Sequence, residues 1–313
     1  MVAPSSTGCA TKVPTVVSTS PTVGSVSQGP AEVTAPDIAP CPAAPDARRS
    51  VVGVIDASDG TTWSTPADLA PPDARKLDDL YNDCTGVRPN GIADVDLDDV
   101  PILEIDPGGE VVTGYLFGDN YFELSVNGRL VGVDPVPYTP FNAAVVRFRV
   151  NRPVTYAVKL VDWEENPGLG TERLGADPFH AGDGGFIASF SDGTVTDASW
   201  QAQTFSIAPL QQPDDVVERE DGSRGTAPLG DTAKPGACAE RCYATRYPIR
   251  PDWADPSVDP GWPAATTYTE AQVGTNFPAY QNFRPELAAG GAQFIWSSDL
   301  VLDNLVLARV TTE

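Results

Sequence analysis

Acidic side chains gather around one tryptophan, Trp163, near the middle of the chain. Calcium is a hard ion that prefers carboxylate and carbonyl oxygens, so this group predicts a calcium site in which loops of the protein meet. The metal ligands that we predict are Asp162, Glu164, Glu165 and Asp183. An ordinary exposed turn is the alternative, because the letters WEEN are followed directly by Pro-Gly.

A second acidic segment imitates the start of a calcium-binding loop without completing it. Asp94, Asp96 and Asp98 have the spacing of the first ligands of an EF-hand. Asp99 occupies the position that needs glycine, and Ile105 occupies the position of the bidentate glutamate. We therefore favour a solvated acidic strand edge, and a calcium site of another type over the seven acids of residues 89–110 is the alternative.

No combination of residues with the pattern of a catalytic site stands out. His180 is the one histidine, and nothing in its loop-like surroundings supplies both a nucleophile and an orienting acid. Paired carboxylates can hydrolyse glycosidic bonds, but among 43 acidic residues some pair has the required separation by chance. We predict no catalytic residue and favour a protein that is not an enzyme, while the sequence leaves that question open.

Tryptophan rings offer a different chemistry, because they can stack on sugar rings. We predict ligand-binding roles for Trp163, Trp253 and Trp262, which stand in turn-rich segments. Trp296 lies inside the apolar segment FIW, so we expect it in the core.

The net charge of −23 and the pI of about 4.2 repel phosphate backbones and anionic lipid headgroups. We therefore expect no nucleic-acid partner. No apolar run reaches the roughly 18 residues that a membrane-spanning helix needs, so we expect no transmembrane segment.

The five cysteines indicate an oxidising compartment. None forms a CxxC pair, and one histidine cannot complete a zinc set of ordinary spacing. Cys41–Cys84 and Cys238–Cys242 are the pairing that we favour, although spacing alone does not decide among three pairings. The small residues before Cys9 are typical of a bacterial lipoprotein junction, which makes Cys9 a candidate lipid anchor.

Short strands punctuated by turns predict the fold. Alternating apolar residues mark strands over 121–126, 146–150, 156–161 and 186–190, and Asn127-Gly128 is a strong hairpin signal. Residues 294–296 and 300–310 read as closing strands, 65–83 as one or two helical turns, and 211–237 as a long exposed loop. The prediction is an all-β sandwich over residues 48–313.

Residues 1–47 contain no aromatic side chain and eight prolines. Such a segment buries too little apolar surface to offset its ordering entropy, so we predict a disordered leader.

The segments DNYFELSVNG (119–128) and TDASW (196–200) are similar to motifs of the galactose-binding-like jelly-roll domains attached to bacterial rhamnosidases and other glycan-active proteins. The resemblance covers roughly residues 110–313. The part that usually opens such a domain appears here near the end, around Trp253, Trp262 and Trp296, which suggests a circular permutation. The resemblance implies a jelly-roll sandwich that binds carbohydrate or packs against a neighbour.

Three functions remain open at this point. The first is a non-catalytic, secreted or surface-anchored module that binds carbohydrate or another cell-surface ligand. The second is a structural or matrix protein without a small-molecule ligand. The third is a carboxylate-dependent, glycan-active enzyme, for which a deep cleft between two unlike carboxylates would be needed.

Overall fold

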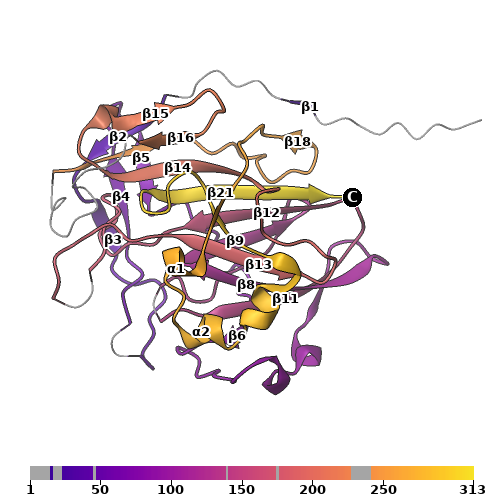
Figure 1. The fold of residues 1–313 in the computed structure, drawn as a ribbon. Coiled ribbons are helices and arrows are strands. Elements are labelled where there is room, and N and C mark those ends of the chain that lie inside the picture. Colours follow the sequence, from indigo (N-terminus) through magenta and orange to yellow (C-terminus); the bar gives the residue numbers. More distant parts are fainter. Residues whose placement is uncertain (1–14, 17–22, 45–46, 139, 174–175, 227–240) are drawn as a thin grey trace, which may run out of the picture.

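Two seven-stranded β-sheets pack face to face in the protein (Figure 1). The computed structural model describes residues 15–16, 23–44, 47–138, 140–173, 176–226 and 241–313. Apart from β7 with β11 and β1 with β18, the paired strands run antiparallel. The predicted all-β sandwich is confirmed, while its assignment to the galactose-binding-like jelly rolls stays a prediction.

The first sheet has the order β10-β9-β12-β21-β14-β17-β2. Its strands are β2 (Ser25–Gln28), β9 (Tyr121–Val126), β10 (Arg129–Val133), β12 (Val154–Val161), β14 (Gln201–Leu210), β17 (Tyr243–Arg246) and β21 (Asp303–Thr312). The second sheet has the order β19-β20-β13-β8-β11-β6, and β7 also pairs with β11. Its strands are β6 (Asp78–Tyr81), β7 (Ile102–Glu104), β8 (Glu110–Asp119), β11 (Ala143–Val150), β13 (Gly185–Phe190), β19 (Thr266–Tyr268) and β20 (Phe294–Trp296).

Smaller elements surround the sandwich. A three-stranded sheet of β3 (Glu32–Ala35), β4 (Val52–Asp56) and β5 (Thr62–Thr65) stands at one end. Two further strand pairs are β1 (Thr15–Val16) with β18 (Val258–Asp259) and β15 (Val216–Glu218) with β16 (Arg224–Thr226). The short α-helices are α1 (Glu270–Val273), α2 (Pro278–Gln281) and α3 (Arg284–Leu287), and the 3-10 turns are η1 (Ile92–Asp94), η2 (Leu97–Asp99), η3 (Pro213–Asp215) and η4 (Ala289–Gly291).

The expected alternation and turn chemistry produce the central strands. Asn127 and Gly128 both have positive φ angles, 49° and 76°, and connect β9 to β10 as a two-residue hairpin. This geometry matches the right-handed twist of the paired strands, and asparagine followed by glycine adopts it readily. The strands predicted over 121–126, 146–150, 156–161 and 186–190 are confirmed as β9, β11, β12 and β13.

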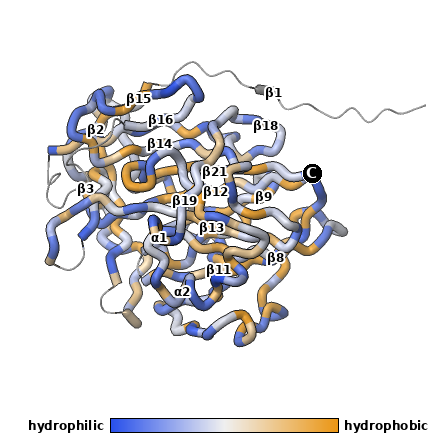
Figure 2. The backbone as a smooth tube through the Cα atoms, viewed as in Figure 1, coloured by the Kyte–Doolittle hydropathy of each residue, from blue (hydrophilic) through white to orange (hydrophobic). Residues whose placement is uncertain are grey.

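The core between the sheets is continuous from the early strands to the last one. Phe294, Trp296 and Val306 belong to the same buried cluster as Phe122 and Phe148. Strand β21 lies between β12 and β14 in the first sheet, and β20 pairs with β13 in the second, so the C-terminal run joins the same sandwich, as predicted. Hydrophobic segments accordingly concentrate in the strands at the centre of the molecule (Figure 2).

Aromatic residues from a region without strand alternation complete the core on the second sheet. Tyr280 of α2 is fully buried, and its ring lies 5.4 Å from those of Phe117 and Phe294. Phe283 and Leu287 belong to the same cluster. In the described part of the chain, none of the helices is long and apolar enough to cross a membrane.

The prediction of a leader that stays unpaired to residue 47 is wrong in its second half. Strand β2 pairs with β17 at the edge of the first sheet, and β3 pairs with β4. Backbone pairing at a sheet edge needs no aromatic side chain, so the composition of this segment concealed it. Residues 1–14, 17–22 and 45–46 lie outside the described residues.

Two local predictions are also corrected. The segment 65–83 holds turns and strand β6 instead of helical turns, because Leu80 and Tyr81 are buried beside β11. The described part of the loop 211–237 contains the hairpin of β15 and β16, in which Arg224 is buried and its guanidinium lies 3.7 Å from the centre of the Tyr247 ring. Residues 227–240 lie outside the described part.

Candidate functional sites

Four carboxyl groups meet at one end of the sandwich, where β8 and β12 end and β13 begins. Asp119 is the last residue of β8, Asp162 and Glu164 follow β12, and Asp183 precedes β13. Asp119, Asp162 and Glu164 are buried, and Asp183 is partly buried. We call these four residues the carboxyl cluster. Strands β8 and β12 belong to different sheets, so the cluster lies at the junction of the two layers.

Hydrogen bonds hold the cluster in place, but they leave one buried carboxylate oxygen without a partner in the described structure. Gly182 N donates to Glu164 Oε1 over 2.9 Å, whereas Glu164 Oε2 has no partner among the described residues. A Cβ at Gly182 would stand 2.3 Å from Glu164 Oε1, so this approach requires glycine. Asn120 Nδ2 donates to Asp119 Oδ1, and the backbone N–H of Trp163 donates to Asn120 Oδ1.

Burial and mutual repulsion favour the protonated forms of these groups. Burial, followed by the charges of Glu164, Asp119 and Asp183, raises the pKa of Asp162 well above its usual range. Burial also raises the pKa of Glu164 to about 8 and that of Asp183 to about 6. Because the charge of Glu164 raises the pKa of Asp162 and burial raises the pKa of both groups, we expect at least one of the two to be protonated near neutral pH.

Positive charge near the cluster is limited. Arg48 lowers the pKa of Asp119 and of Glu164, but it also forms an ion pair with Glu172 and lies over the ring of Tyr138. His180 lowers the pKa of Asp183. Four buried or partly buried acids with so little compensation need either protons or a bound cation.

The structure brings together three of the four predicted metal ligands, Asp162, Glu164 and Asp183. Glu165 is engaged elsewhere, because its Oε2 accepts a hydrogen bond from Arg173 N. Asp119 was missed, although it stands in the same DNYFELSVNG segment that carries the resemblance. Within the described ranges, no three acidic, histidine or cysteine side chains already have the arrangement of a metal site, so a cation would have to draw these carboxylates closer together.

The other polar candidates have structural roles. Asp94, Asp96 and Asp98 are exposed residues of the η1 and η2 turns, and Asp96 caps the N–H of Asp98. They form exposed turns instead of the expected strand edge, since the local 3-10 hydrogen bonds close within the segment. His180 Nε2 lies 3.6 Å from Glu172 Oε1, opposite which it forms a β-bridge.

Three tryptophans, Trp163, Trp200 and Trp296, are buried. Trp296 is in the core as predicted, and its indole N–H donates to Asp303 O. Trp163 was predicted to contact ligand, but it has no exposed surface, and its indole N–H donates to Val51 O. Trp163 therefore presents no ring at the molecular surface.

Trp253 and Trp262, the other predicted ligand-binding residues, form a pair. Their rings stack with centroids 6.4 Å apart and planes inclined by 26°, and both residues are only partly buried. The ring of Phe205 supports Trp262 edge-on from β14. Arg309 Nη1 donates to the carbonyl oxygens of Trp253 and Asp255, which ties the segment to β21.

A polar hollow of about 290 Å³ adjoins the Trp253–Trp262 segment. Its lining includes Gln201, Asp259, Arg309 and Thr311, and Gln201 Nε2 donates to Asp259 Oδ1. The hollow shares the 253–262 segment with the two tryptophans through Pro256, Val258 and Asp259, although neither indole ring lines it.

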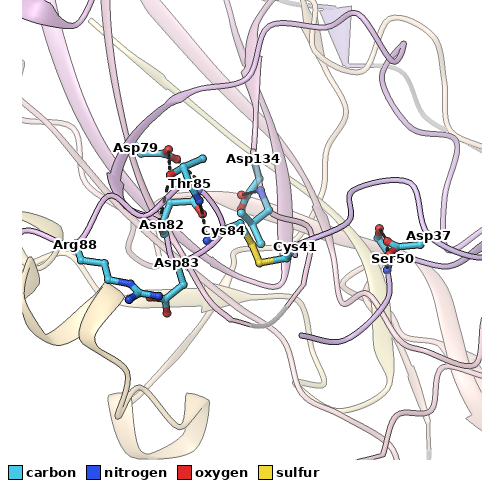
Figure 3. Close-up of a disulfide and its surroundings, with 11 residues drawn as sticks. Asp37, Cys41, Ser50, Asp79, Asn82, Asp83, Cys84, Thr85, Arg88 and Asp134 are labelled. Atoms are coloured by element: carbon cyan, nitrogen blue, oxygen red, sulfur yellow. Dashed lines mark hydrogen bonds and ion pairs between the residues drawn. A yellow bond between two sulfur atoms is a disulfide. The ribbon is translucent and has the colours of Figure 1, made fainter. Parts of the chain in front are cut away.

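The predicted disulfide between Cys41 and Cys84 is confirmed, with Cα atoms 4.9 Å apart (Figure 3). Asn82 prepares the position of Cys84, because its Oδ1 accepts from Cys84 N while its Nδ2 donates to Asp79. The pairing of Cys238 with Cys242 and the lipid anchor at Cys9 stay predictions, since Cys238 and Cys9 lie outside the described residues.

Comparison with known proteins gave no relative: no family model, no curated protein and no solved structure matches the chain.

Proposed function

We propose that this protein is a non-catalytic binding module that recognises carbohydrate at the surface formed by Trp253, Trp262 and the adjoining polar hollow. The observation that carries the proposal is the partly exposed, stacked tryptophan pair, whose segment Arg309 ties to β21 and whose residues Pro256, Val258 and Asp259 line the hollow. The C–H face of a pyranose can pack on an indole ring, while its hydroxyl groups need donors and acceptors at the side.

Several features favour binding over catalysis. The carboxyl cluster brings together four acids whose pKa values are raised. Three of these four residues are buried. A glycan-cleaving pair must reach both sides of a sugar bond, which buried carboxyls do not. The polar hollow contains the single carboxylate Asp259 among its lining residues.

The compartment belongs to the same proposal. The Cys41–Cys84 disulfide supports an oxidising, extracellular environment. The acidic surface supports solubility in the presence of salts. Anchoring to a cell surface through Cys9 would place the binding surface outside the cell.

Affinity electrophoresis tests this proposal. A protein with a charge of −23 migrates rapidly towards the anode at neutral pH, so retardation by xylan, mannan or galactan in the gel is easily read. We expect at least one of these polysaccharides to slow the parent protein and the Phe277→Ala control, which removes an exposed aromatic ring elsewhere. Trp253→Ala and Trp262→Ala should migrate freely. Equal retardation of all four proteins would overturn the proposed surface.

A calcium ion at the carboxyl cluster is a separate part of the proposal. Its oxygen donors suit a hard cation, and the unpartnered Glu164 Oε2 is available to one. The cation would replace the protons on these carboxyl groups and join the loops that follow β8 and β12.

A further inference from the structure

A second hollow lies between the three-stranded sheet β3-β4-β5 and the outer face of the main sandwich. It shares no lining residue with the polar hollow. Its volume is about 410 Å³, which is within the range of small-molecule sites. The walls are mostly aliphatic, proline and aromatic, and include Val54, Leu69, Val133 and Trp163. We call it the apolar cavity.

The walls of the apolar cavity are fixed by specific bonds. The indole N–H of Trp163 donates to Val51 O, which joins the sandwich to the small sheet. Ser50 Oγ accepts from the N–H groups of Ile38 and Ala39, which form part of another wall. A cavity that is preformed in this way costs a ligand little ordering entropy.

The disulfide supports the same cavity. In the chain, Cys41 follows the wall residues Ile38 and Ala39, and Cys84 follows strand β6 and the wall residue Lys76. Lys76 is itself held beside Val133 by a β-bridge and by the bond from Leu77 N to Val133 O. The covalent link therefore fixes the distance between two walls that are far apart in sequence.

The lining of the apolar cavity contains few charged side chains, although the protein as a whole is strongly acidic. Lys76 and Asp134 are its charged lining residues. Lys76 is exposed and has no hydrogen bond or ion pair within 4 Å in the described ranges, but its charge acts on Asp134 and lowers the pKa of that carboxyl. Burial raises the pKa of Asp134 well above its usual range, so this carboxyl opposes an anion less than an exposed aspartate would. The cavity thus combines an apolar interior with an exposed lysine in its wall.

We propose that the apolar cavity binds a small amphiphilic carboxylate, whose apolar part occupies the cavity and whose carboxylate pairs with Lys76. Charge complementarity identifies this class over a neutral or cationic amphiphile. The overall charge of −23 would draw a cationic amphiphile to the protein in general. If the protein binds the anion more tightly than the cation, the preference must come from Lys76 at the cavity, because the net charge of the protein favours the cation.

Isothermal titration calorimetry with octanoate, 1-octanol and octyltrimethylammonium, each below its micellar concentration, tests this inference. We expect one octanoate per chain, bound more tightly than octyltrimethylammonium. Lys76→Gln should weaken octanoate roughly two- to fivefold, as for a partly exposed ion pair, and leave 1-octanol unchanged. Lys76→Arg keeps the charge and should restore the affinity for octanoate.

Two further variants test the location. Ala70→Phe fills the cavity and should abolish binding of octanoate, whereas Ala93→Phe, in an exposed turn elsewhere, should not. Trp262→Ala should leave octanoate binding unchanged, so failure here is distinct from failure of the carbohydrate proposal. Absence of octanoate binding, tighter binding of the cation, or an unchanged octanoate affinity in Lys76→Gln would each overturn the inference. The Lys76 variants keep the test decisive if Ala70→Phe does not fold.

Discussion

Replacing Glu164 by glutamine should stabilise the protein at alkaline pH. The folded-state pKa of this carboxyl is about 8 instead of 4.5, because burial penalises its charged form. Between these two values the folded state holds a proton that the unfolded state has lost, so the free energy of unfolding falls as pH rises. At pH 8 most of this cost is present, and for such a group it amounts to roughly 4 kcal/mol.

Glutamine keeps the shape of the side chain and the acceptor for Gly182 N but has no proton to lose. Asp162 remains buried and retains part of the cost, so we expect Glu164→Gln to gain at least about 2 kcal/mol at pH 8. At pH 5 the parent carboxyl is protonated, and the two proteins should differ little. Urea unfolding at both pH values, with a chelator present, measures the difference.

Asp94→Asn is the matched control, since Asp94 is exposed on the η1 turn. It should follow the parent protein at both pH values. A Glu164→Gln variant that is no more stable than the parent at pH 8, or that gains equally at pH 5, would refute the assignment of a protonated, buried Glu164.

Three other perturbations follow from the fold and the sites. Removing the disulfide in a Cys41→Ala/Cys84→Ala variant frees a loop with a sequence separation of 43. The free energy of unfolding, measured in urea, should fall by roughly 4 kcal/mol. An unchanged unfolding midpoint would contradict this account. Deleting residues 290–313 removes β21 from between β12 and β14 and should abolish the circular-dichroism melting transition, whereas cooperative melting at the parent temperature would show that the C-terminal strands are dispensable. Calcium should raise the melting temperature more at pH 8 than at pH 5, because it competes with protons for the carboxyl groups. In the Asp162→Asn variant calcium should no longer raise the melting temperature. If calcium does not change the melting temperature of the parent protein at either pH, calcium binding is contradicted.

The central strands could be predicted from sequence because each one carries its own signal. The alternation around Phe122 and Phe148 and the turn at Asn127-Gly128 depend on nearest neighbours in the chain. Strands β2 and β3 could not be found in this way, because their stability comes from pairing with β17 and β4. Tyr280 was missed for a similar reason, since helices of four residues leave little periodicity to detect.

The candidate sites show the same division. Asp162 and Glu164 are two residues apart, so their proximity was accessible from the sequence. Asp119 joins them only because β8 and β12 end at the same edge of the sandwich, 43 positions apart in the chain. The apolar cavity combines residues from Thr34 to Trp163 and depends on how the small sheet is placed, which no motif encodes.

A glycan array probed with the parent protein and with the Trp253→Ala/Trp262→Ala variant tests the central claim most directly. We predict that the parent protein binds a restricted set of glycans and that the double variant loses them, while Phe277→Ala retains them. An array on which the parent protein binds no glycan, or on which the double variant keeps the parent pattern, would contradict the proposal that this protein recognises carbohydrate through its stacked tryptophans.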